Sequence, residues 1–445
     1  MRGKRRIWVR VVVGLLVVVV VAATAGYWYL RPLLRTGTGY AAHNACALDV
    51  IAHRPMTEDL PPNPLVPYLR IGQDGGGYRA SVLGVLAAQQ AWAVDDFGCT
   101  LAPGRPSFGA ATPITTAANP LAGPATPRLT PALEAALAGA FGDDLDQDAR
   151  ERLGTRGVVV VRDGRIVAER YAPGFTADTP QLGWSMAKSV TSLLTGVLVG
   201  ERKLALSDDR LRPEWSDDRA RITVEDLLRM RSGLAWDETY DLGTTITAML
   251  YDQPDMASFV ASQPLVHPVG STQQYSSGST NLLCSVLRDR TGQGADLPRA
   301  ALLASLGVSS AVWEADATGT PVCSSYLWAT PRDWATIGEF ARADGVWNGR
   351  RLLPEGWMRQ TTTVVTPPSA EDPNYAAGWW TNRTASGSVI DQRLPRDAYW
   401  ASGHDGQRLY VVPSEKLVVV RLGFSPAADD IRTEQLVADV IKVLG

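Results

Sequence analysis

The first hydrophobic signal in the chain is an uncharged, valine-rich run over residues 11–29. About 20 apolar residues, rising about 1.5 Å each, span the hydrocarbon core of a bilayer. Residues 27–29 are aromatic, as is typical of a membrane interface, and a basic cluster over residues 2–10 is typical of a cytoplasmic flank. The pattern predicts a membrane anchor. The alternative is a signal peptide cleaved after the small residues 23–25, but signal cores usually run only about 7–15 residues, so we favour the anchor.

The periodicity of the second half of the chain predicts an α+β fold. Residues 130–141 and 430–443 have helical patterns, and Pro131 suits a first helical turn. Strand-like runs at 158–161 and 165–171 flank Asp163-Gly164, and runs at 409–412 and 417–422 flank residues 413–416, so each pair predicts a β-hairpin. We therefore expect one antiparallel sheet built from both ends of this region, flanked by helices and carrying a helical insertion.

The domain boundaries follow from composition. Seven prolines fall within residues 103–131, where no clear periodicity exists, and this stretch is expected to be a linker. The chain then divides into a basic segment and anchor (1–35), a small exported segment with the linker (36–128) and a large domain (129–445). Within the small segment, residues 80–94 have a pattern that predicts a helix.

The distribution of charge along the chain argues against a nucleic acid as the partner. The net charge is −3, but residues 1–35 hold seven basic groups and no acid, which leaves 36 basic and 46 acidic residues in the rest of the chain. An acidic body argues against nucleic-acid binding, which needs a basic surface.

The four cysteines agree with export. Cys46 and Cys99 bracket the small segment, whereas Cys284 and Cys323 lie in the large domain. No CxxC pair exists, so a zinc ribbon or a thioredoxin-like motif is not expected. In an oxidising compartment we favour the pairs 46–99 and 284–323, the alternative being four buried free thiols.

Candidate chemistry lies in residues 184–194. Ser185 and Lys188 are three residues apart, so on a helix their side chains project from one face. Serine needs a neighbouring base to act as a nucleophile, and a lysine can serve when burial lowers its pKa. The run around Lys188 is small and apolar, as that chemistry requires. A helix N-terminus at Ser185 would also supply N–H groups to a developing oxyanion.

These residues belong to a wider pattern that resembles the serine β-lactamase-like hydrolases: class C β-lactamases, serine D-alanyl-D-alanine carboxypeptidases and related esterases and amidases. The resemblance covers residues 129–444. Residues 185–188 match the first motif, whose Ser is acylated and whose Lys is the base. Residues 222–228 and 232–234 are similar to a typical segment of the superfamily, residues 275–277 resemble its Tyr-x-Asn motif, and residues 402–407 occupy the place of its Lys/His-Thr-Gly motif.

Two departures favour one branch of the superfamily. Ser277 stands where β-lactamases and peptidases usually have Asn, and residues 404–406 read His-Asp-Gly, which removes a fixed cation. Both departures, and residues 375–380, resemble the 6-aminohexanoate-dimer hydrolase and esterase branch.

The resemblance implies a role for each site residue. Ser185 attacks an ester or amide carbonyl, Lys188 accepts its proton, and Tyr275 relays the proton to the leaving group. The oxyanion and substrate are held by the Ser185 N–H and by groups around residue 407, with Trp379 and Trp380 as pocket walls. The predicted oxyanion and substrate residues are therefore Ser277, His404, Gly406, Gln407, Trp379 and Trp380.

We expect an exported, membrane-anchored serine hydrolase that acts on a small ester or amide with no metal or cofactor. Two alternatives stay open. One is a cell-wall D-alanyl-D-alanine carboxypeptidase or β-lactamase, which the compartment favours and residues 277 and 404 oppose. The other is an inactive homologue with a binding or regulatory role.

Overall fold

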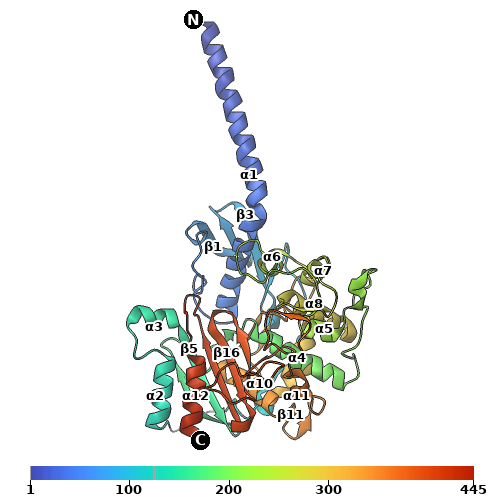
Figure 1. The fold of residues 1–445 in the computed structure, drawn as a ribbon. Helices are drawn as coiled ribbons and strands as arrows, with labels where there is room; N and C mark the ends of the chain where they lie inside the picture. The colour runs from blue at the N-terminus through green and yellow to red at the C-terminus, as the bar shows by residue number, and fades with distance from the viewer. Residues whose placement is uncertain (1, 124–126, 128) are drawn as a thin grey trace.

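The core of the fold is a six-stranded antiparallel sheet that the two ends of the large domain build together (Figure 1). The computed structural model describes residues 2–123, 127 and 129–445, with side chains from residue 6 onward. In order across the sheet the strands are β14 (Trp380–Thr381), β15 (Tyr399–Gly403), β16 (Gln407–Val412), β17 (Leu417–Gly423), β5 (Thr155–Arg162) and β6 (Arg165–Tyr171). The α+β class and both predicted hairpins are confirmed.

The turn of the first hairpin shows why its sequence was informative. Asp163 and Gly164 have φ values of 51° and 74°. A two-residue turn with both residues at positive φ matches the twist of the flanking strands, and Asp-Gly adopts it with little strain.

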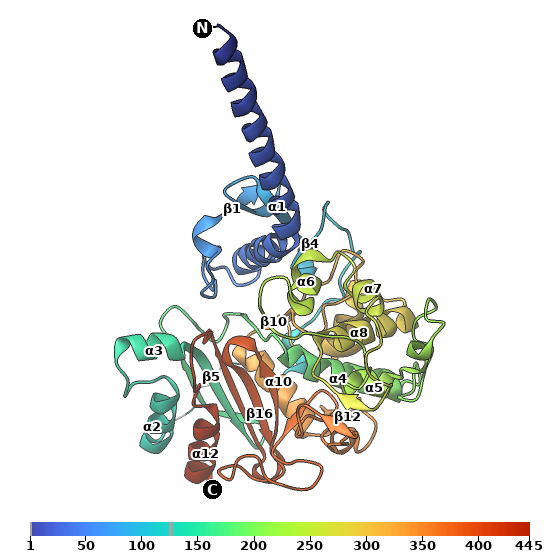
Figure 2. The same ribbon diagram turned by 45° about the horizontal axis from the view of Figure 1, so that its top comes forward.

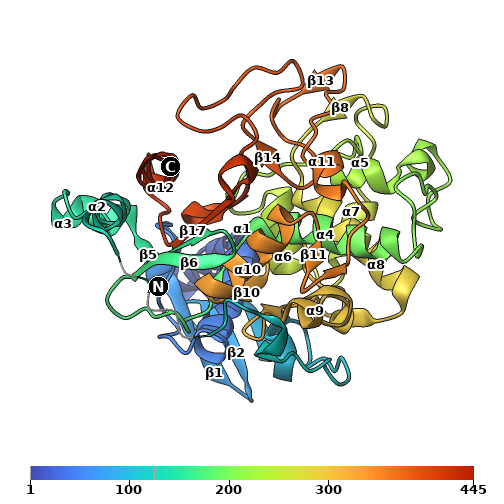
Figure 3. The ribbon, with the colours of Figure 1, turned by 90° about the horizontal axis from the view of Figure 1, so that it is seen from below.

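Helices cover both faces of the sheet because its strands bury both sets of alternating side chains. Val159 and Val161 face α10 (Pro331–Arg342) and the main core, whereas Val158 and Val160 face a second cluster made by α2 (Pro131–Ala140) and α12 (Thr433–Leu444). Figure 3 shows these two layers on opposite sides of β5 and β17. The two predicted helices are thus confirmed as α2 and α12.

The insertion between the hairpins is mainly helical, as expected, and it carries the helices nearest the site. Its helices are α4 (Met186–Gly200), α5 (Val224–Leu228), α6 (Thr245–Asp252), α7 (Met256–Ala261), α8 (Ser277–Thr291), η6 (Arg299–Leu303), α9 (Ala304–Leu306), α10 and α11 (Trp357–Thr361); α3 (Gln147–Leu153) precedes the sheet. Short strands pair within it: β7 (Gln181–Leu182), β8 (Thr272–Gln273), β9 (Val312–Trp313), β10 (Leu327–Ala329), β11 (Val346–Trp347), β12 (Arg350–Arg351) and β13 (Ser369–Ala370).

The amino-terminal part is one long helix and a small sheet. Helix α1 (Arg2–Val50) projects from the body, and its second half enters the body beside β1 (Leu69–Asp74), β2 (Gly77–Val82), β3 (Leu86–Ala93) and β4 (Cys99–Leu101) (Figures 1 and 2). Helix α1 is long and apolar enough to cross a membrane, and its apolar side chains from residue 7 to residue 21 are exposed. A helix of this kind is a membrane anchor or a signal segment, and either one indicates an extracytoplasmic location for the body of the chain.

The helix predicted for residues 80–94 is wrong, because β2 and β3 occupy this stretch. Leu83 and Gly84 both have positive φ, at 51° and 87°, and make the turn between the strands. The small side chains of this stretch, such as Ala80 and Ala91, pack against alanines of α1 in a shared cluster. The sequence of one stretch does not show that a distant helix, here α1, will cover its apolar face.

The expected disulfides are both present, Cys46–Cys99 and Cys284–Cys323. The first joins α1 to β4, and the second joins α8 to the loop after β9. The proline-rich stretch contains only the short turn η3 (Thr116–Ala118) among its described residues, yet it is fastened to the body: buried Asn119 donates to Asp333 Oδ1 at 2.8 Å.

Candidate active site

Ser185 lies at the N-terminal end of α4, on a tight turn that follows β7. Trp184 before it has a φ of 48°, a left-handed value for a bulky residue, and the Met186 N–H bonds the Gly183 carbonyl at 3.1 Å. A Cβ on Gly183 would collide with the ring of Trp334, and a Cβ on Gly403 would collide with the Gly183 carbonyl. The two glycines thus let the end of β15 approach the turn that carries Ser185.

Lys188 is one turn further along α4 and points back to Ser185. Its Nζ lies 2.8 Å from Ser185 Oγ, 2.8 Å from Ser277 Oγ and 3.2 Å from the Ser324 carbonyl. The side chain is only 2% exposed. Burial lowers the pKa of Lys188 to about 8, although the Glu238 carboxylate opposes the shift. Near neutral pH a usable fraction of this amine is therefore unprotonated.

Glu238 is a member of the cluster that the sequence did not reveal. Its carboxylate accepts hydrogen bonds from the Ser277 N–H at 2.8 Å and from Ser277 Oγ at 2.6 Å, and Oε1 lies 3.9 Å from Lys188 Nζ. Trp236 Nε1 donates to its other oxygen at 2.5 Å. Glu238 lies in a loop four residues after the recognisable segment 232–234, and no local motif marks it.

Tyr275 borders the same cluster just before α8. Lys188 Nζ lies 4.8 Å from the centroid of its ring. Burial raises the pKa of Tyr275, and hydrogen bonding to Ser185 acts in the opposite direction. The ring stacks on Trp380 with centroids 5.6 Å apart, so Trp380 holds the tyrosine in place as well as bordering the cleft.

The third predicted segment contributes an imidazole. His404 is 37% exposed, and its Nδ1 lies 2.8 Å from Oδ1 of the buried Asp405. Its ring packs on Tyr240 at 4.4 Å between centroids. Asp405, with a φ of 57°, turns the backbone so that the His404 side chain enters the cleft.

Of three other predicted residues, Gly406 lines the cleft, whereas Gln407 and Trp379 lie outside its lining. The Gln407 side chain is buried and joins Gly423 by two hydrogen bonds, of 2.6 and 3.0 Å. The Gly406 carbonyl accepts from the buried Arg421 at 2.7 Å, which fixes the turn. Trp379 is fully buried and packs edge-on against Tyr399, away from the cleft that Trp380 lines.

An open cleft of about 460 Å³ unites these parts. It also exposes Arg408, a cation that the sequence analysis did not single out. The cleft is lined by Ser185, Glu238, Tyr240, Tyr275, Trp380, Ser402, Gly403, His404, Asp405, Gly406, Arg408, Ser425, Ala428, Asp429 and Ile431. Ser185, Tyr275 and His404 therefore come together from segments up to about 220 residues apart, as the motif order predicted.

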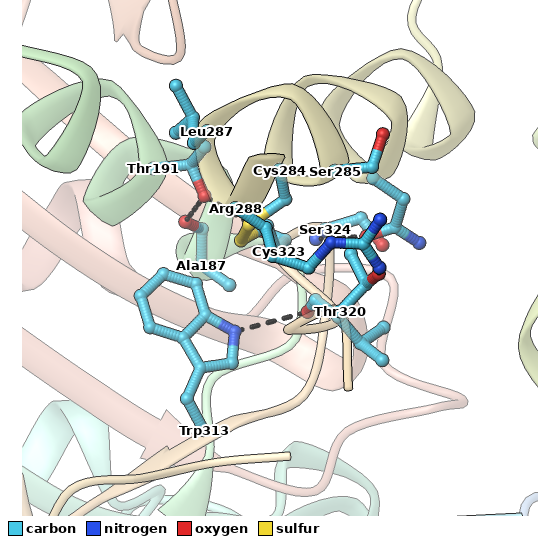
Figure 4. The surroundings of a disulfide bond; sticks show 12 residues. Ala187, Thr191, Cys284, Ser285, Leu287, Arg288, Trp313, Thr320, Cys323 and Ser324 are labelled. Atoms are coloured by element: carbon cyan, nitrogen blue, oxygen red, sulfur yellow. Dashed lines mark hydrogen bonds between the residues drawn. A yellow bond between two sulfur atoms is a disulfide. The ribbon is translucent and has the colours of Figure 1, made fainter. Parts of the chain in front are cut away.

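The second disulfide lies next to a backbone carbonyl that accepts a hydrogen bond from Lys188. Cys284 on α8 is bonded to Cys323, next to Ser324 (Figure 4). The Ser324 carbonyl accepts a hydrogen bond from Lys188. Asn281 Oδ1, one turn earlier on α8, accepts from the Ser324 N–H at 2.9 Å. The Cys323 carbonyl also accepts from Thr191 Oγ1 of α4 at 3.1 Å. Among the described residues, no group of three or more His, Cys, Asp or Glu could hold a metal ion.

Comparison with known proteins agrees with this geometry. The family model for beta-lactamase matches residues 143–440, two thirds of the chain. The chain belongs to the beta-lactamase family. That family assignment covers the whole sheet and every residue of the cleft.

Individual relatives of the beta-lactamase family are distant. The chain is 25% identical to the 6-aminohexanoate-dimer hydrolase of Paenarthrobacter ureafaciens over 64% of its own length and 76% of that protein. A solved structure from Bacillus anthracis, assigned as a 6-aminohexanoate-dimer hydrolase, has a TM-score of 0.56 at 21% identity, with 67% and 81% covered. The class C beta-lactamase of Rhodobacter sphaeroides gives 0.52 at 16%, with 71% and 100% covered. The two structures show that the beta-lactamase fold is shared.

Proposed function

We propose that this protein is an exported, membrane-anchored serine hydrolase that cleaves a carboxylic ester or amide through an acyl-enzyme on Ser185. Ser185 Oγ attacks the carbonyl carbon while its proton passes to Lys188, and the bond to the leaving group then breaks as that group is protonated. Water attacks the acyl carbonyl in the second half of the cycle and regenerates Ser185. The 6-aminohexanoate-dimer hydrolase relative supports the amide or ester class.

The contact between Lys188 and Ser185 carries the proposal. A hydroxyl of high pKa is activated only by a base within hydrogen-bond reach, and the 2.8 Å separation meets that condition. A pKa of about 8 places Lys188 near working pH, where it can accept and return a proton. A lysine on an exposed helix surface would have neither property.

Tyr275 is proposed as the second proton carrier. It borders Ser185 and Lys188 and opens onto the cleft where a leaving group would stand. Because burial raises its pKa, the hydroxyl stays protonated and can donate to the leaving group.

The oxyanion is proposed to bind between Ser185 and the end of β15. In the described part of the chain the Ser185 N–H has no protein acceptor, since the helix bonds begin at the Met186 N–H. Strand β14 pairs with Tyr399 and Trp400, so the edge of β15 beyond Trp400 borders the cleft at Ser402. A free N–H group at a helix start, such as that of Ser185, is a preorganised donor of the kind that acyl transfer needs.

A second candidate function, cleavage of a carboxylate-bearing amide such as a β-lactam or a D-alanyl peptide, is favoured by one observation. Arg408 lines the cleft although the usual cation of the third motif is absent. A guanidinium there can pair with a substrate carboxylate.

Labelling with a fluorophosphonate tests the proposal. The wild-type protein is expected to be labelled and to hydrolyse p-nitrophenyl acetate, whereas Ser185→Ala loses both. Ser262→Ala, which changes an exposed serine on the same domain, is the control and should behave as wild type. Labelling by a fluorescent penicillin in the same assay supports the second candidate. Unchanged labelling of Ser185→Ala would show that the nucleophile lies elsewhere.

A further inference from the structure

A second cavity lies between the amino-terminal segment and the hydrolase domain. Its volume is about 480 Å³, within the range of about 300–1,000 Å³ typical of small-molecule sites. One wall is α1 and the loop that follows it, including Gly37, Leu65 and Val66. The opposite wall belongs to the hydrolase domain, with Leu242 and Tyr251 among its members. Most of the lining is apolar.

This cavity adjoins the active-site cleft. Tyr240, His404 and Asp405 line both spaces. Trp184, which directly precedes Ser185, also lines the cavity and packs edge-on against Tyr240 at 6.1 Å. The rings of Tyr240 and His404, which pack on each other with centroids 4.4 Å apart, thus lie between the two spaces, and a molecule with its carbonyl at Ser185 would reach the apolar space by passing them.

The amino-terminal wall is held firmly in place. Asp59 forms ion pairs with Arg156 of β5 and with Arg54, and its backbone carbonyl accepts from Tyr40 at 2.9 Å. Burial opposes ionisation of Asp59, but the two guanidinium groups still lower its pKa, so the carboxylate stays charged at neutral pH and both ion pairs persist. Deeper in the same interface, His43 lies 3.2 Å from the fully buried Glu314. These contacts hold the amino-terminal wall of the cavity against the hydrolase domain.

The cavity also lies close to the membrane end of α1. Tyr27 at the end of the apolar run accepts a hydrogen bond from the Ala87 N–H at 3.1 Å, and the tip of the β2–β3 hairpin exposes Leu83 and Val85. At about 1.5 Å per residue, Gly37 is about 15 Å along the helix from Tyr27. The cavity therefore lies on the side of the body from which the apolar half of α1 projects.

We infer that this cavity binds the hydrocarbon chain of the substrate, so that the enzyme acts on esters with a medium or long alkyl group. The inference rests on the proposed function, since it places the ester carbonyl at Ser185. The Tyr240 hydroxyl at the junction is buried without a partner in the described part of the chain, and can bond the ester group where the hydrocarbon chain leaves the cleft.

Chain-length dependence tests the inference in the full-length protein embedded in phosphatidylcholine nanodiscs. Each buried methylene contributes about 0.8 kcal/mol, about fourfold, so kcat/KM should rise at least tenfold from p-nitrophenyl acetate to the octanoate. Val66→Trp and Leu242→Trp, which fill the cavity, should remove this preference while acetate hydrolysis stays within about twofold. Val365→Trp is the matched control on an exposed site and should keep the preference.

A binding assay separates this inference from the proposed function. Ser185→Ala, which cannot turn over, should bind 11-dansyl-undecanoate, and the binding should fall at least tenfold when Val66→Trp is added. Full hydrolysis by Ser185→Ala, with binding retained, would overturn only the proposed nucleophile. An octanoate preference or dansyl-undecanoate binding that survives both filling variants would overturn the cavity assignment. Octanoyl esters supplied in vesicles or dispersed in buffer then distinguish a membrane source from a soluble one.

Discussion

At the scale of single residues, the site depends on how two opposing effects act on Lys188. Burial disfavours the ammonium form, and Glu238 at 3.9 Å favours it, with the outcome that the pKa lies near 8. Because the base works in its neutral form, kcat/KM should rise with pH through this value.

Glu238→Gln tests that balance. The change removes the negative charge that stabilises the Lys188 ammonium, so the pKa of Lys188 should fall and the acidic limb of kcat/KM should move to lower pH, by about one pH unit. The measurement is the pH profile of ester hydrolysis from pH 5 to 9. Glu371→Gln, an exposed carboxylate outside the cleft, should leave the limb unmoved. A limb that stays put, or that moves to higher pH, would contradict the assigned coupling.

The same residues show what a sequence can and cannot foresee. Ser185, Lys188 and Tyr275 were predictable because short spacing and motif order place them together. Glu238 was not, since its partner Ser277 is 39 residues away and the loop between carries no periodic signal. Trp379 and Trp380 look equivalent in sequence, but Trp379, just before β14, is fully buried, whereas Trp380, the first residue of β14, borders the cleft.

At the scale of elements, the site is assembled where α4, α8 and the loop after β9 meet. Lys188 comes from the first, Ser277 from the second and the Ser324 carbonyl from the third. The Cys284–Cys323 disulfide joins the last two, so it should fix the position of an acceptor of Lys188.

Removing each disulfide in turn separates positioning from stability. The closed loops span 39 and 53 residues, so the chain-entropy model assigns each bond about 4 kcal/mol of stability. We expect Cys284→Ser with Cys323→Ser to lower kcat for p-nitrophenyl acetate about 10- to 100-fold, because the acceptor of Lys188 is misplaced. Cys46→Ser with Cys99→Ser should lower thermal stability by a similar amount but leave acetate turnover nearly intact. Equal losses of turnover in the two variants, measured well below their melting temperatures, would show that both disulfides only stabilise the fold.

The elements themselves were predictable wherever local chemistry determined them. Asp163-Gly164 fixed one hairpin, and Pro131 marked the first turn of α2. Residues 80–94 were misassigned because their alanine-rich face is covered by α1, a contact between distant segments that no local pattern reports.

At the scale of the whole molecule, the amino-terminal segment packs against the hydrolase domain. The ion pair between Asp59 and Arg156 seats it on the hydrolase domain, beside the cleft, and the Cys46–Cys99 bond joins α1 to the small sheet within the segment. Composition predicts a division into anchor, linker and enzyme, but the packing of the amino-terminal segment against the large domain could not be predicted, because it depends on ion pairs such as Asp59–Arg156 that join residues 97 positions apart.

The central claim is that Ser185 carries the acyl group, and trapping the acyl-enzyme tests it most directly. The protein is mixed with p-nitrophenyl octanoate, quenched in acid within the first turnovers and analysed by intact mass and peptide mapping. We expect a mass gain of one octanoyl group, confined to the peptide that contains Ser185 and absent from Ser185→Ala. An acyl group on any other residue, or full turnover by Ser185→Ala, would contradict it.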